Sequence, residues 1–142
     1  MKKRIRNQRG AALLETAITI PLILAVCVAI FEFGRAYQTW QVITNAAREG
    51  ARVAILAETS DAQVTTAVRN YMQSGQLKSY ASASVGVERT VPFGENTASR
   101  ITVTYPFDFT VLNPVMRLLQ SGSTTGQGTT MMSSIALMRN ES

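Results

Sequence analysis

Residues 1–31, MKKRIRNQRG AALLETAITI PLILAVCVAI F, decide the fold, because a basic segment ends in glycine and a long apolar run follows it. The apolar run, 11–31, holds a single formal charge, that of Glu15. About 20 apolar residues allow a helix to cross the hydrocarbon core of a bilayer. A carboxylate inside such a run is unfavourable and marks a candidate functional residue. The sequence therefore predicts a transmembrane segment at 11–31, with a basic leader at 1–10 before it.

The excess positive charge of the chain lies in this leader. Residues 1–10 contain five Lys or Arg residues and no carboxylate, whereas the other nine cations equal the nine Asp and Glu residues in number. The net charge of +5 thus does not indicate a nucleic-acid-binding domain, and no nucleic-acid partner is expected. Cations beside a span remain in the cytoplasm. We therefore expect a single pass with a cytoplasmic N-terminus and a C-terminal part across the membrane.

Residues that could carry catalysis are few. The chain has no His, and its one cysteine, Cys27, lies inside the apolar run. His-based acid–base catalysis and His or multi-Cys metal sites are therefore excluded. Glu49 and Arg52 are three residues apart on a predicted helix, which favours a solvated or structural ion pair over a site. We expect no catalytic residue, metal ligand or cofactor, and hence a protein that is not an enzyme.

The helical pattern continues beyond the membrane. Apolar or small residues recur every three or four positions, at Phe33, Tyr37, Trp40, Ile43, Ala47, Ala51 and Ala54. We expect one helix over 11–57, whose part 32–57 projects out of the membrane. Tyr37 and Trp40 suit either an aromatic belt at the membrane surface or a core under the head domain, and the pattern leaves both open. The small residues from 46 to 54 predict a closely packed partner, most simply the protein's own sheet.

The remaining residues, 58–142, are expected to form a small head domain. A second helix is predicted at 61–73, with Ser60 or Asp61 as its cap and Gly75 as its stop. Alternating apolar residues and turn residues predict strands at 84–91, 100–105 and 129–139, and a hairpin loop at 93–97. Pro106 is expected to end the second strand or to place it at an edge. Residues 111–119 are predicted as irregular or a short helix around Pro114, and 121–128 as a loop. The fold class is α+β: one long helix, a second helix and a three-stranded antiparallel sheet.

Several segments resemble one family. Gly10 followed by an apolar run with Glu15 as its fifth residue resembles the cleavage region of type IV prepilins. The segments FEFGRA (31–36) and TNAAREGAR (44–52) resemble TadE-like pseudopilins of tight-adherence (Flp) pilus systems, and so do VTYPF (103–107) and ALMRNE (136–141). Thr16 stands where the major pilins of these systems usually have tyrosine, and the head is much larger than theirs. The chain is therefore similar to a minor pilin or pseudopilin, and the resemblance implies a pilin-like head on the membrane helix.

The resemblance also implies a function and partners. A prepilin peptidase would cut between Gly10 and Ala11, and the processed chain would act with other pilins, pseudopilins and an inner-membrane assembly platform in pilus assembly, adhesion or secretion. Its place would be the bacterial inner membrane, with the head in the periplasm or carried into the pilus. Glu15 would pair with the new ammonium group of Ala11 on a neighbouring subunit. On spacing alone, Glu15 serves equally as a residue reaching the cytoplasmic interface, and the resemblance favours the assembly role. The rival reading is an uncleaved, single-pass membrane-anchored adaptor or receptor domain.

Overall fold

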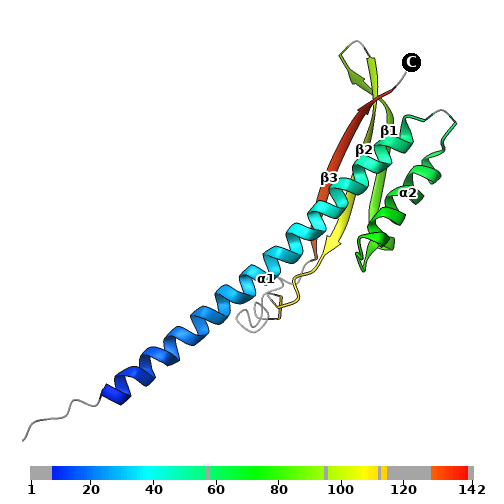
Figure 1. Cartoon of the computed structure of the whole chain (residues 1–142). Helices are drawn as coiled ribbons and strands as arrows, with labels where there is room; N and C mark the ends of the chain where they lie inside the picture. The colour runs from blue at the N-terminus through cyan, green and yellow to red at the C-terminus, as the bar shows by residue number, and fades with distance from the viewer. Residues whose placement is uncertain (1–7, 57, 95, 112, 115–128, 141–142) are drawn as a thin grey trace, which may run out of the picture.

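The computed structural model describes residues 8–56, 58–94, 96–111, 113–114 and 129–140 (Figure 1). The elements follow in the order α1 (Gln8–Ala54), α2 (Asp61–Ser74), a short 3₁₀ turn η1 (Tyr80–Ser82), β1 (Ser84–Phe93), β2 (Asn96–Phe107) and β3 (Thr130–Arg139). The predicted α+β class, with a long N-terminal helix, a second helix and a three-stranded antiparallel sheet, is confirmed.

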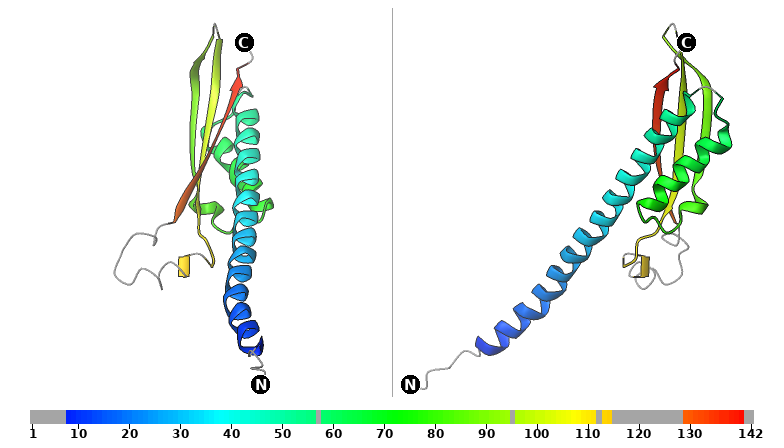
Figure 2. Two further views of the ribbon diagram at one scale, coloured as in Figure 1. Left: turned by 90° about the vertical axis from the view of Figure 1, so that its left-hand side faces the viewer. Right: turned by 45° about the vertical axis from the view of Figure 1, so that its right-hand side comes forward.

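Helix α1 is one continuous element of 47 residues and runs through Pro21 without a break. At the α-helical rise this corresponds to about 70 Å. Its first half stands free of the head, and its second half lies along the sheet and α2 (Figures 1 and 2). The single long helix is confirmed, although it ends at Ala54. The last predicted residue, Ala57, lies outside the described part of the chain.

The sheet has the strand order β1-β2-β3, so β2 is its central strand. The β1–β2 hairpin turns at Gly94, whose φ of 62° is one that glycine adopts without strain. The prediction for Pro106 is correct only on one side of the strand. The β1 ladder ends at the pair Ser84–Thr104, whereas on the other side β2 continues through Pro106, opposite Met131, as far as Phe107. Proline is tolerated because β2 has a single neighbour at this point.

Helices α1 and α2 cover one face of the sheet, and the core lies between the two layers (Figure 2). The small residues of α1 let these elements approach closely, as predicted. A Cβ atom on Gly50 would lie 2.5 Å from Val68 Cγ2 of α2 and 3.2 Å from Ile101 Cγ2 of β2. The close partner is therefore α2 as well as the sheet.

The predicted apolar stripe of α1 is wrong in its first half. Phe33, Tyr37 and Trp40 are 71%, 61% and 46% exposed, whereas Glu32 and Thr39 are buried with Ile43. The exposed positions (33, 37 and 40) and the buried positions (32, 39 and 43) both recur at helical spacing. The apolar run before them does not indicate which of the two sets faces the core. For Tyr37 and Trp40 the core reading is wrong, and an aromatic belt stays a prediction for these two residues.

Helix α2 begins with a capping box, in which Ser60 accepts from the Gln63 N–H and the Gln63 side chain accepts from the Ser60 N–H. Gly75 ends the helix as predicted, but its φ of −76° is not left-handed, and the left-handed residue is Gln76. Glycine is required at 75 because a Cβ atom there would lie 2.5 Å from Val42 Cγ1 of α1. The predictions for 115–119 and 121–128 lie outside the described residues.

Candidate processing and assembly site

The predicted cleavage point lies at the start of α1. Gly10 and Ala11 are exposed and belong to the first turns of the helix, which begins at Gln8. The ends of helices open at little cost because their terminal groups lack intrahelical partners. The Gly10–Ala11 bond is therefore accessible, and the turn that holds it can open without disturbing the rest of α1.

Glu15 lies one turn further along α1, with its side chain exposed. Leu13, Leu14 and Ile18 around it are also exposed, between 64% and 72%. The carboxylate has no ion-pair partner among the described residues of this single chain. The neighbouring Thr16 hydroxyl donates to the Ala12 carbonyl at 2.8 Å and is thus satisfied within the helix. Glu15 is therefore a single charge on an otherwise apolar surface, available to a group from outside the chain.

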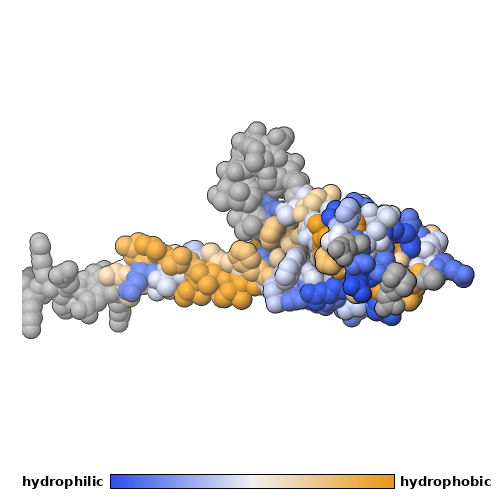
Figure 3. All heavy atoms as spheres, turned by 90° about the horizontal axis from the view of Figure 1, so that it is seen from above, coloured by the Kyte–Doolittle hydropathy of each residue, from blue (hydrophilic) through white to orange (hydrophobic). Residues whose placement is uncertain are grey.

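The apolar surface of α1 continues from this point toward the head (Figure 3). Within the helix from Gly10 to Ala54, the most apolar 18-residue stretch has a mean hydropathy of 2.4, and none of it is buried inside the molecule. Length and composition are sufficient for one crossing of a bilayer. The helix is therefore consistent with a membrane anchor.

Glu32 joins the apolar part of α1 to the head, a role that the sequence pattern does not predict. This carboxylate directly follows the apolar run and is only 2% exposed. Its Oε1 accepts the N–H of Val111 at 2.5 Å, and its Oε2 accepts Arg35 Nη1 at 2.9 Å. Val111 lies 79 residues further along the chain, so its hydrogen bond ties the segment after β2 to α1 just beyond the apolar run, while the Arg35 bond holds the Glu32 carboxylate within α1.

Arg35 extends this junction. Its Nη2 donates to the Asp108 carbonyl at 3.5 Å, and its guanidinium carbon lies 5.3 Å from the centroid of the Phe107 ring. A guanidinium at this distance from an aromatic face is attracted by the ring quadrupole. A carboxylate at the end of an apolar run with an arginine one helical turn later could have indicated the Glu32–Arg35 pair, but not the contact with Val111.

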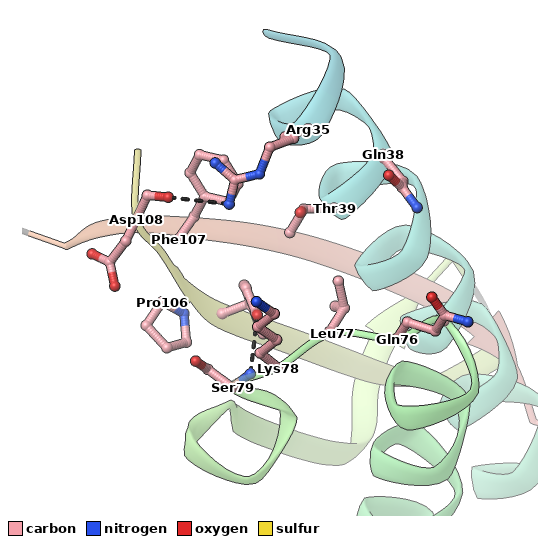
Figure 4. Close-up of a pocket in the computed structure, with 12 residues that line it drawn as sticks. Arg35, Gln38, Thr39, Gln76, Leu77, Lys78, Ser79, Pro106, Phe107 and Asp108 are labelled. Atoms are coloured by element: carbon pink, nitrogen blue, oxygen red, sulfur yellow. Dashed lines mark hydrogen bonds between the residues drawn. The ribbon is translucent and has the colours of Figure 1, made fainter. Parts of the chain in front are cut away.

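A pocket of about 280 Å³ opens beside this junction (Figure 4). Its wall consists of side chains from α1, the segment after α2 and the end of β2, including Arg35, Gln38, Leu77, Lys78 and Phe107. Ser79 donates its N–H to the Tyr105 hydroxyl at 3.2 Å and closes one side. Nowhere in the described residues do three His, Cys, Asp or Glu side chains gather as a metal site would require. The pocket walls provide packing and polar contacts, and we assign no catalytic residue to them.

The TNAAREGAR segment divides into a packing face and a polar face. Ala46, Ala47 and Ala51 are buried against α2 and the sheet. On the outside, Arg52 donates to Glu49 through Nη2 at 2.6 Å and through Nε at 3.0 Å, which confirms the predicted ion pair. The hydrogen bond from Arg52 lowers the pKa of the Glu49 carboxyl. This segment therefore serves the fold, because its small residues set the distance between α1 and the head.

Comparison with known proteins agrees with the resemblance seen in the sequence. Residues 10–52 match the family model described as TadE-like protein, which confirms the expected resemblance for the segment from Gly10 to Arg52. The match covers the predicted span, the Glu32–Arg35 junction and the TNAAREGAR segment, and accounts for less than half of the chain. It associates this segment with Tad pilus systems. No curated protein and no solved structure matches the chain.

Proposed function

We propose, on the premise that residues 10–52 are TadE-like, that this chain is a pseudopilin or minor pilin of a tight-adherence pilus. In this role it is processed after Gly10 and acts, without any enzymatic activity of its own, in pilus assembly. The observation that carries the proposal is the placement of Glu15, a lone exposed carboxylate on an apolar helix, one turn beyond an accessible Gly10–Ala11 bond.

Processing would give Glu15 a partner. Cutting after Gly10 creates an ammonium group on Ala11, and a cation buried among apolar helices requires a compensating anion. The Glu15 carboxylate of a neighbouring subunit is the anion at the matching depth. A buried ion pair adds little net stability, but it fixes the relative position of two elements. The pair would therefore set the axial offset between subunits.

The charge distribution supports the proposed placement in the cell. Five cations before the span favour a cytoplasmic N-terminus, so the head would lie in the periplasm of a bacterium and the anchor in its inner membrane. The partners implied are a prepilin peptidase, other pilin subunits and the assembly platform. The Glu32–Arg35 junction is compatible with this role, because it ties the segment after β2 to α1 directly after the apolar run.

The test compares Glu15→Gln with the adjacent control Thr16→Ala, in a host with the complete pilus system. Removal of a charge from an apolar segment favours insertion, so membrane levels and cleavage should be at least those of the wild type. Pilus formation should be lost in Glu15→Gln and retained in Thr16→Ala, because Thr16 bonds only within its own helix. Normal pili from Glu15→Gln would refute the pairing. Recovery of only uncleaved chain from the wild type would favour the membrane-anchored adaptor.

A further inference from the structure

The pocket beside the Glu32–Arg35 junction lies at the level where the surface of a bilayer would be. Arg35 follows Phe31, the last residue of the apolar run, by four residues, or about 6 Å at the α-helical rise. The headgroup layer of a bilayer extends about 5–8 Å beyond the hydrocarbon core on each side. A helix that crosses the membrane with residues 11–31 therefore brings the Arg35 wall of this pocket to the level of the phospholipid phosphates on the head side.

Two cationic side chains line the pocket and keep unused N–H groups. Arg35 uses two of its five N–H groups, one on the Glu32 carboxylate and one on the Asp108 carbonyl. Lys78 comes from the segment after α2 and is exposed. Its ammonium forms no ion pair with any residue that the structure describes. Both cations can therefore donate to an acceptor in the pocket.

A buried hydroxyl adds a third donor. Tyr105 lines the same pocket, although the residue is only 6% exposed. Its oxygen accepts the Ser79 N–H at 3.2 Å, and among the described residues its own proton has no acceptor. Buried polar groups in proteins are almost always hydrogen-bonded. A ligand oxygen in the pocket would satisfy the Tyr105 proton, which a purely apolar ligand cannot do.

The charge of the pocket fits a phosphodiester. The Glu32 carboxylate neutralises Arg35 at 2.9 Å, so Lys78 supplies the remaining unit of positive charge. The Asp108 carboxylate points away from both cations, and Asp108 presents its main-chain carbonyl to Arg35 instead (Figure 4). A phosphodiester carries one negative charge and several acceptor oxygens, and Lys and Arg donate strong, charge-assisted hydrogen bonds to such oxygens. One ligand phosphate thus matches both the charge and the three donors.

We infer that this pocket binds the phosphate group of a membrane phospholipid, in the leaflet on the head side. Lys78 supplies the charge, Arg35 and Tyr105 donate to phosphate oxygens, and the acyl chains remain in the hydrocarbon beside α1. The contact holds the lower end of the head at the membrane surface. The inference rests on the membrane anchor within the proposed function, and it applies to the pilus component and to the membrane-anchored adaptor alike.

The first test is amine-reactive labelling of the full chain in maltoside micelles, read by peptide mass, because Lys78 is the one lysine after residue 10. Three additions are compared: phosphatidylglycerol, diacylglycerol, which lacks the phosphate, and inorganic phosphate. Phosphatidylglycerol should slow the labelling of Lys78 about fivefold, which corresponds to the roughly 1 kcal/mol that one cation gains at an anionic lipid surface. Diacylglycerol and inorganic phosphate should leave the rate unchanged.

Tyr37→Lys supplies the matched control. Tyr37 is 61% exposed and is not part of the pocket wall, although it lies only two residues beyond Arg35. A lysine at position 37 meets the general charge of the micelle surface, which salt screens, and should be slowed much less than Lys78. Equal protection of the two lysines, or protection of Lys78 by diacylglycerol, overturns the inference. Equal protection by inorganic phosphate overturns the lipid as ligand and assigns the pocket to a soluble phosphate.

A second test counts the phosphatidylglycerol molecules that the chain retains in native mass spectrometry. Lys78→Gln keeps the length of the side chain and removes its charge, and should weaken retention about fivefold. The control Arg69→Gln removes an exposed cation of α2 outside the pocket and should retain lipid as the wild type does. Equal retention by Lys78→Gln and wild type refutes the site.

The proposed function fails by different observations. Processing after Gly10 and pilus formation do not depend on Lys78, so loss of lipid binding with intact processing refutes the pocket alone. A chain that remains soluble without detergent or membrane would overturn the anchor, and with it both proposals.

Discussion

Replacing Glu32 by alanine should release the segment after β2 from α1. Two contacts are lost: the hydrogen bond to the Val111 N–H and the ion pair to Arg35. A buried donor left without an acceptor costs about 1–3 kcal/mol, and breaking a fully buried ion pair costs about 3–5 kcal/mol. Because the Arg35 side chain is 36% exposed and water can solvate its charge, the lower range applies. We expect a loss of about 2 kcal/mol in the local opening free energy.

The assay is hydrogen exchange at the Val111 amide in the full chain in detergent micelles. A loss of about 2 kcal/mol corresponds to roughly 30-fold faster exchange, since about 1.4 kcal/mol equals a factor of ten. Glu32→Gln should have a smaller effect, because its amide oxygen still accepts from Val111. The matched control is Glu49→Ala, which removes a similarly spaced pair whose arginine is 61% exposed. Equal exchange at Val111 in Glu32→Ala, Glu49→Ala and wild type would refute the junction.

Four further outcomes test the packing and electrostatics of the chain. Gly50→Ala should lower head stability by about 1–2 kcal/mol in thermal unfolding, because overpacking against Val68 costs about 1–3 kcal/mol. Gly34→Ala, with open space around its Cβ, should instead gain up to about 1 kcal/mol from helix propensity. Ser60→Ala should cost about 1 kcal/mol through loss of the α2 cap, measured by the same unfolding. The NMR titration midpoint of Glu49 should lie below that of an ordinary carboxyl and rise to it in Arg52→Gln. Because the folded-state pKa is lowered, the stabilisation by this pair is complete above the unfolded-state pKa and is lost as the pH falls through the folded-state pKa.

The sequence predicted those elements that residues close together in the chain determine. Continuous apolar and small residues predicted α1, Ser60 and Gln63 carried the cap of α2, and alternation predicted the strands. The sequence did not predict the features that contacts between distant residues determine. The buried face of α1 begins at Glu32 because Val111 and Arg35 satisfy its carboxylate, and nothing local to Glu32 reveals a partner 79 residues away. Likewise Pro106 is accommodated in the central strand because the pairing with β1 stops at Ser84–Thr104, which leaves Pro106 with β3 as its single neighbouring strand.

The most direct measurement of the central claim is the intact mass of the wild-type chain, expressed with and without its cognate prepilin peptidase. We expect loss of residues 1–10 only when the peptidase is present, leaving Ala11 as the N-terminus. A bulky substitution such as Gly10→Leu should prevent the cut, because a subsite that accepts glycine has no space for a side chain. Full-length chain in both samples, or a cut elsewhere than between Gly10 and Ala11, would contradict processing after Gly10.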